Sequence, residues 1–89
     1  MKKITMFILG SCPYCKEAFR LMDTLYTENP AYKSLEIDII DEYLHPEISE
    51  RYDYSYVPTY YVNGEKLHDG AATLEKIRRV FDAAMGEIK

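Results

Sequence analysis

The sequence predicts an α/β fold in which a four-stranded mixed sheet carries helices on both faces. Three observations lead to this prediction: an apolar run at residues 4–9, a helical periodicity directly after it, and an Asn63-Gly64 dipeptide between two short β-type segments. The expected order of elements is β-α-β-α-β-β-α. The chain has 89 residues, enough for one hydrophobic core, so we expect a single domain over residues 1–89.

The first two elements follow from the spacing of apolar residues. Residues 4–9 are nearly all apolar and end at Gly10, which is typical of a strand buried on both faces. From Pro13 onward, apolar residues recur at spacings of three and four, and charged residues fall on the other side. This pattern predicts an amphipathic helix with Pro13 in its first turn and Asn29-Pro30 at its end.

A second strand and a second helix are expected next. Residues 35–40 alternate between apolar and acidic side chains, which is the pattern of a strand. The strand–helix–strand order implies a right-handed crossover, so this strand should run parallel to the first. Residues 45–53 are predicted to form a short helix with Leu44, Ile48 and Tyr52 on one side.

The C-terminal part predicts a hairpin followed by a helix. Residues 57–62 and 65–69 lie on either side of Asn63-Gly64, a dipeptide that strongly favours a tight hairpin turn. Hairpin strands are antiparallel, so the sheet should be mixed. Thr73 is a suitable N-cap for the last helix, and Gly86 is a suitable C-terminal stop.

The charge balance argues against one class of partner. The formal net charge is -4, whereas nucleic-acid binding requires a basic face. The one basic cluster, Lys76, Arg78 and Arg79, is interpreted as a solvated face of the last helix. No apolar run approaches the ~18 residues of a transmembrane helix, so we expect no membrane partner. We expect a cytoplasmic monomer.

The two cysteines, Cys12 and Cys15, are the strongest functional signal. Their spacing allows a small disulfide ring across one helical turn. Cys12 would then lie at the helix start, where unpaired N–H groups and the macrodipole favour a thiolate. So short a loop removes little unfolded-state entropy, which favours reversible dithiol exchange over a structural bridge. We take Cys12 as the nucleophile, Cys15 as the buried resolving thiol, and the pair as a redox-active disulfide. No metal site is expected.

A resemblance to a known family rests on two motifs. Cys12-Pro13-Tyr14-Cys15 resembles the active-site motif of dithiol glutaredoxins, and Val57-Pro58 resembles the loop that carries a cis-proline beside the thiols. Over its whole length the chain is identified as a glutaredoxin-like member of the thioredoxin-fold superfamily. The resemblance implies a thioredoxin-like fold and an oxidoreductase that reduces protein disulfides or glutathione mixed disulfides. It also implies no bound cofactor, glutathione as co-substrate, and a substrate- or glutathione-binding set: Tyr14, Val57, Pro58 and Gly70.

The chain departs from the glutaredoxin pattern at two places. Leu9-Gly10-Ser11 has no lysine just upstream of the first cysteine, and Ala72 stands where a carboxylate contact is expected. Two alternatives therefore stay open. One is a glutaredoxin-like redoxin that is reduced again by thioredoxin reductase. The other is a redox-silent binding module or an iron–sulfur scaffold.

Overall fold

The computed structural model describes residues 2–86 and has the predicted order of strands and helices, with one additional short helix. The strand order in the sheet is β2-β1-β3-β4. β1 pairs parallel with β2 and antiparallel with β3, and β3 pairs antiparallel with β4. The predicted mixed four-stranded sheet is therefore confirmed. The elements are β1 (Ile4–Ile8), α1 (Pro13–Glu28), the 3-10 helix η1 (Pro30–Ser34), β2 (Ile37–Asp41), α2 (Pro46–Ser49), β3 (Thr59–Val62), β4 (Glu65–Asp69) and α3 (Leu74–Met85).

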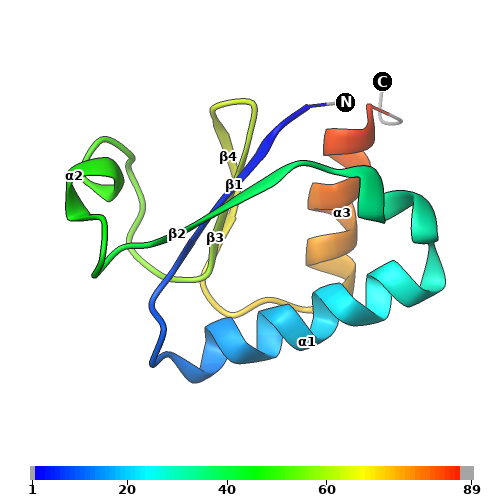
Figure 1. The fold of residues 1–89 in the computed structure, drawn as a ribbon, viewed down its shortest axis with the longest axis horizontal. Helices are drawn as coiled ribbons and strands as arrows, with labels where there is room; N and C mark the ends of the chain where they lie inside the picture. The colour runs from blue at the N-terminus through cyan, green and yellow to red at the C-terminus, as the bar shows by residue number, and fades with distance from the viewer. Residues whose placement is uncertain (1, 87–89) are drawn as a thin grey trace.

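The helices form layers on both faces of the sheet, as predicted. α1 and α3 lie on one side of the strands, and α2 lies on the other side (Figure 1). Successive residues of a strand point to opposite faces, and β1 follows this rule. Ile4 and Met6 are fully buried in the core beneath α1 and α3, whereas Phe7 faces the opposite side. β1 is thus buried on both faces, which explains why its sequence is almost continuously apolar.

Aromatic rings cover the second face. Phe7 lies 4.7 Å from Tyr52 and 4.9 Å from Tyr54, measured between ring centroids. Tyr61 of β3 meets Phe7 edge-on at 6.0 Å. This packing corrects the predicted helix at residues 45–53, because α2 spans only Pro46–Ser49. Beyond it the chain continues in turns and irregular structure that bring Tyr52 and Tyr54 onto Phe7.

Leu44 and the second strand also differ from expectation. Leu44 is 66% exposed instead of packing with Ile48 and Tyr52. The second strand runs from Ile37 to Asp41, because Leu35 caps η1 by donating its N–H to the Tyr32 carbonyl at 3.1 Å. η1 was not predicted, although a contact between neighbouring residues fixes its start. The Asn29 side chain accepts a hydrogen bond from the Ala31 N–H at 3.2 Å.

The hairpin turn and α3 agree closely with the sequence, but β3 begins at Thr59 and not at residue 57, because Val57 and Pro58 lie in the irregular loop before it. Asn63 and Gly64 have positive φ angles of 54° and 90°, as a tight hairpin turn requires. The Thr73 side chain accepts from the Lys76 N–H at 3.2 Å, and Gly86 ends the helix with φ 80°. Within residues 2–86, no helix is long and apolar enough to cross a bilayer.

Candidate active site

Cys12 lies in the short connection between β1 and α1, where its backbone forms the N-cap of the helix. Its N–H donates to the Leu9 carbonyl at 2.9 Å, and its backbone is extended at φ -80° and ψ 123°. Pro13, at the first helical position, fixes the backbone for the first turn and has no N–H to leave unpaired. The Cys12 side chain is partly exposed, so its sulfur is accessible.

The expected N–H donors to the Cys12 sulfur are not observed. Cys12 makes no side-chain capping hydrogen bond. The reason is geometric: the N–H groups of Cys15 and Lys16 both point to the Cys12 carbonyl oxygen, at 3.1 and 3.3 Å.

Cys15 lies one turn into α1 and is buried, as predicted. Its side chain is 2% exposed, and both cysteines are free thiols. Burial raises the pKa of the Cys15 thiol to about 11, with a further rise from the neighbouring Cys12. The Leu9 N–H, 3.5 Å from the Cys15 sulfur, opposes this rise in pKa. Cys15 is therefore protonated at neutral pH.

A hollow of about 470 Å³ opens beside Cys12. It brings together three of the residues predicted to bind substrate, namely Tyr14, Val57 and Gly70. Tyr14 is 59% exposed at its rim. Pro58 and Cys15 are buried and do not line it. The lining residues are Cys12, Tyr14, Ser55, Tyr56, Val57, Gly70 and Ala71.

The loop before β3 carries the predicted cis-proline. The Val57–Pro58 peptide bond is cis. The Pro58 carbonyl accepts from the Gly70 N–H at 3.0 Å, which ties this loop to the end of β4. Within residues 2–86, neither the N–H nor the C=O of Val57 has a hydrogen-bond partner. Val57 thus offers one donor and one acceptor at the hollow, which suits an extended chain that pairs with it as an added strand.

A second hollow, of about 340 Å³, lies on the other side of the cysteine loop and was not predicted from the sequence. Asp41 connects its two walls, because its carboxylate accepts from the Gly10 N–H at 3.1 Å and from the Tyr43 N–H at 2.8 Å. The signal was present: β1 and β2 are parallel, so the residues that follow them meet at one edge of the sheet. The hollow is lined by Leu9, Gly10, Ser11, Asp41, Tyr43 and Leu44.

Sequence comparison places these features in a family context. The family model described as the thioredoxin domain matches residues 2–82. A curated protein named thioredoxin, from Methanocaldococcus jannaschii, is 31% identical over 75 residues, which is 84% of this chain and 86% of that protein.

Solved structures share the fold. An uncharacterized thioredoxin-like protein from Clostridium perfringens has a TM-score of 0.72 and 22% identity, over 94% of this chain and 71% of that chain. The oxidised thioredoxin from Plasmodium falciparum has a TM-score of 0.68 and 19% identity, over 92% of this chain and 79% of that chain. A protein disulfide oxidoreductase from Aeropyrum pernix has a TM-score of 0.63 and 28% identity, over 96% of this chain and 38% of that chain. These overlaps confirm the predicted fold.

Proposed function

The chain belongs to the thioredoxin-domain family, and on this premise we propose that it reduces protein disulfides with Cys12 and Cys15. The observation that carries the proposal is the contrast between the two thiols. Cys12 is partly exposed and lines a hollow, whereas Cys15 is buried one turn behind it and stays protonated. An accessible nucleophile with a protected second thiol is the arrangement that two-step disulfide exchange needs.

The reaction proceeds through a mixed disulfide. The Cys12 thiolate attacks one sulfur of the substrate disulfide, forms a new S–S bond with it, and releases the other substrate sulfur as a thiolate that takes up a proton. Cys15 then loses its proton and attacks the Cys12 sulfur. The second substrate sulfur leaves as a thiolate and is protonated. The substrate gains two electrons and two protons, and Cys12 and Cys15 become a disulfide.

The hollow supplies the substrate contacts in this proposal. The free N–H and C=O of Val57 pair with an extended substrate segment beside Cys12. Tyr14 flanks the substrate sulfur, and Gly70 leaves room for the substrate backbone because it has no side chain.

The lining of the hollow favours thioredoxin reductase over glutathione as electron donor. Glutathione carries two carboxylates and one ammonium at neutral pH, and each requires a charged or strongly polar partner. None of the seven residues that line the hollow is charged. Glutathione, the co-substrate expected for a glutaredoxin, therefore finds only uncharged contacts here, and Tyr14, Val57 and Gly70 are among them. We propose the thioredoxin-like cycle first and the glutaredoxin-like cycle as the alternative.

Single-cysteine variants test the reaction. Cys15→Ser should accumulate a mixed disulfide between Cys12 and a disulfide-containing protein such as insulin, visible as an adduct by intact mass spectrometry. Cys12→Ser should form no adduct and should lose dithiol activity. An adduct through Cys15 in the Cys12→Ser variant would contradict the assigned roles.

Two recycling systems distinguish the donors. Oxidised protein is incubated either with thioredoxin reductase and NADPH, or with glutathione, glutathione reductase and NADPH, at matched concentrations. Faster NADPH oxidation with thioredoxin reductase is expected. Faster turnover with glutathione would favour the glutaredoxin-like cycle, and failure of both systems to reduce the disulfide would remove the ground for the enzyme proposal.

A further inference from the structure

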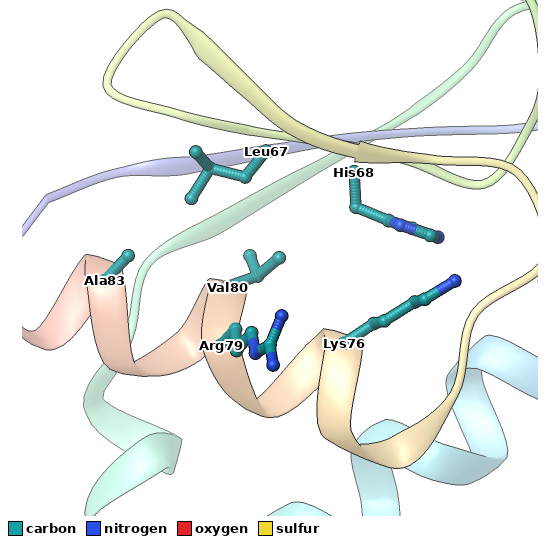
Figure 2. A pocket seen from close by; sticks show the side chains of 6 residues that line it. All are labelled: Leu67, His68, Lys76, Arg79, Val80 and Ala83. Atoms are coloured by element: carbon teal, nitrogen blue, oxygen red, sulfur yellow. The ribbon is translucent and has the colours of Figure 1, made fainter.

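A third hollow lies away from the cysteines, between the outer strand β4 and helix α3. It measures about 410 Å³ and has an apolar floor with two cations at its rim. Figure 2 shows Leu67 and His68 on the strand side and the other four side chains on the helix side. We call this surface the β4–α3 groove. Its lining residues are Leu67, His68, Lys76, Arg79, Val80 and Ala83.

A β-bulge creates the strand wall of the groove. Tyr60 pairs with His68 and Tyr61 pairs with Lys66, so Leu67 is an extra residue on β4. In a regular strand, two successive side chains point to opposite faces. Here Leu67 and His68 both line the groove, because the bulge re-aims one of them. Leu67 remains 41% exposed, which leaves an apolar surface without a partner.

The helix wall carries cations without partners. Lys76, Arg79, Val80 and Ala83 recur at spacings of three and four and so form one stripe along α3. Within residues 2–86, Lys76 and Arg79 form no ion pair. The basic cluster, predicted to lie on one solvated face of the last helix, therefore lies on two sides of it. Lys76 and Arg79 line the groove, whereas Arg78 does not.

Arg78 belongs to the other side of α3. It bonds to Glu28 of α1 at 2.7 Å and to Glu75 at 3.1 Å. Asp82, on the same side, accepts from the Tyr32 hydroxyl. The acidic groups of α3 are thus engaged away from the groove, and they leave Lys76 and Arg79 unneutralised.

The groove and the hollow beside Cys12 are neighbours along the chain. Gly70 and Ala71 line the hollow, and His68 and Lys76 line the groove, so only the short β4–α3 connection separates them. A direct contact joins the two, since a ring nitrogen of His68 lies 3.0 Å from the Gly70 carbonyl. A substrate chain that leaves the hollow past Gly70 arrives at the His68 end of the groove.

We propose that the β4–α3 groove binds an acidic segment of the protein substrate, next to the segment that carries its disulfide. This inference rests on the proposed function. Glutamate or aspartate side chains of the segment pair with Lys76 and Arg79, and an apolar side chain packs on Leu67, Val80 and Ala83. Because the whole chain carries a net charge of -4, most of the surface repels acidic segments, and the two cations and apolar floor of the groove make it their preferred place.

Direct binding tests the groove without any thiol chemistry. The Cys12→Ser/Cys15→Ser protein is titrated into a fluorescent peptide, Glu-Leu-Glu-Ala-Glu, and into a matched peptide with Gln at each Glu. Fluorescence anisotropy should show tighter binding of the acidic peptide. The Lys76→Gln/Arg79→Gln substitution should weaken that binding by about two- to thirtyfold and leave the Gln peptide unaffected.

A charge-matched variant is the control. Lys33→Gln/Arg51→Gln also removes two exposed positive charges but lies outside the groove. It should bind the acidic peptide within about twofold of the parent protein, because the Debye length is only ~8 Å at physiological salt. Leu67→Ser should weaken both peptides, since both carry leucine. Equal binding of the two peptides, equal loss in the two charge variants, or equally tight binding of a DNA oligonucleotide would overturn the proposal.

Turnover separates this inference from the proposed function. With the wild-type cysteines, a disulfide peptide that carries the acidic tail should have a lower KM than one with the Gln tail, and Lys76→Gln/Arg79→Gln should abolish the difference at unchanged kcat. Turnover of both peptides with equal KM values overturns the groove proposal and leaves the reductase proposal standing. No turnover of either peptide overturns the reductase proposal, and the anisotropy result then decides the groove.

Discussion

The Gly10 N–H donates a 3.1 Å hydrogen bond to a carboxylate oxygen of Asp41, which ties the loop before Cys12 to the end of β2. The other carboxylate oxygen accepts from the Tyr43 N–H at 2.8 Å and the Leu44 N–H at 3.4 Å. One side chain therefore orders both the loop that carries Cys12 and the turn that follows β2. Asp41 acts as a positioning residue.

Asp41→Ala should lower the free energy of unfolding by about 1–3 kcal/mol. The substitution leaves three N–H groups without their acceptor, and each bond to a charged group is worth up to a few kcal/mol before solvent screening. Urea unfolding measures the effect. Asp23→Ala, at an exposed position of α1, is the control and should stay within about 0.5 kcal/mol of wild type. An unchanged midpoint in Asp41→Ala would show that the loop does not depend on this carboxylate.

Cys12 should react with iodoacetamide well before Cys15. The Cys12 sulfur is accessible, whereas the Cys15 side chain is 2% exposed and its thiol is protonated at neutral pH. Peptide mapping by mass spectrometry after short exposure at pH 7 should find the label on Cys12 alone. Equal labelling of both cysteines in the folded protein would be incompatible with a buried resolving thiol.

Alkaline pH should destabilise the reduced protein through Cys15. Its folded pKa is raised to about 11, above the ordinary value of 9.0, so the folded state retains a proton that the unfolded state has lost. The contribution of the protonated Cys15 thiol to the free energy of unfolding is complete below pH 9 and is lost as the pH rises from 9 through 11. The loss should reach about 2 kcal/mol relative to Cys15→Ser, measured by urea unfolding with a reductant present.

The Cys15→Ser comparison removes the part of the tyrosine contribution that does not depend on Cys15. Burial also raises the pKa values of Tyr32 and Tyr60, and they cause a loss of the same sign in both proteins. Parallel stability curves for the two proteins between pH 8 and pH 11 would mean that Cys15 has the same pKa in the folded and unfolded states.

Two glycine variants separate backbone strain from crowding of the hollow. Gly70 and Gly64 have nearly equal φ angles, 92° and 90°, which an alanine adopts only at a cost of about 1–2 kcal/mol. Both Gly70→Ala and Gly64→Ala should therefore lower the unfolding free energy by a similar amount. Only Gly70→Ala places a methyl group at the hollow, 3.7 Å from the Tyr56 Cβ. It alone should raise KM for a protein disulfide; an equal rise in Gly64→Ala would trace the effect to stability.

The elements that the sequence predicts well are those with local signals. Pro13 and Asn29 bound α1, Thr73 caps α3, and Asn63-Gly64 closes the hairpin, each through bonds within a few residues. The extent of α2 was overestimated because Tyr52 is held by Phe7, which lies far away in the sequence. Periodicity alone does not show such a tertiary contact.

The site was predicted unevenly for the same reason. Cys12 and Cys15 are fixed by their spacing along one helix, and the Val57–Pro58 bond is cis as the resemblance implied. Asp41 was missed although the parallel pairing of β1 and β2 was predicted, because its role depends on the conformation of the two loops whose N–H groups donate to its carboxylate. The bulge at Leu67 has no glycine or proline to mark it, so the sequence contained no signal for the β4–α3 groove.

The bulge at Leu67 also has a consequence for the outer edge of the sheet. β4 is an outer strand of the sheet, and a flat outer strand presents unpaired N–H and C=O groups to which strands of other molecules can add. The extra residue breaks the regular spacing of those groups, and Glu65 and Lys66 place charges beside the break. The same irregularity that shapes the groove thus disfavours the addition of another strand at this edge of the sheet.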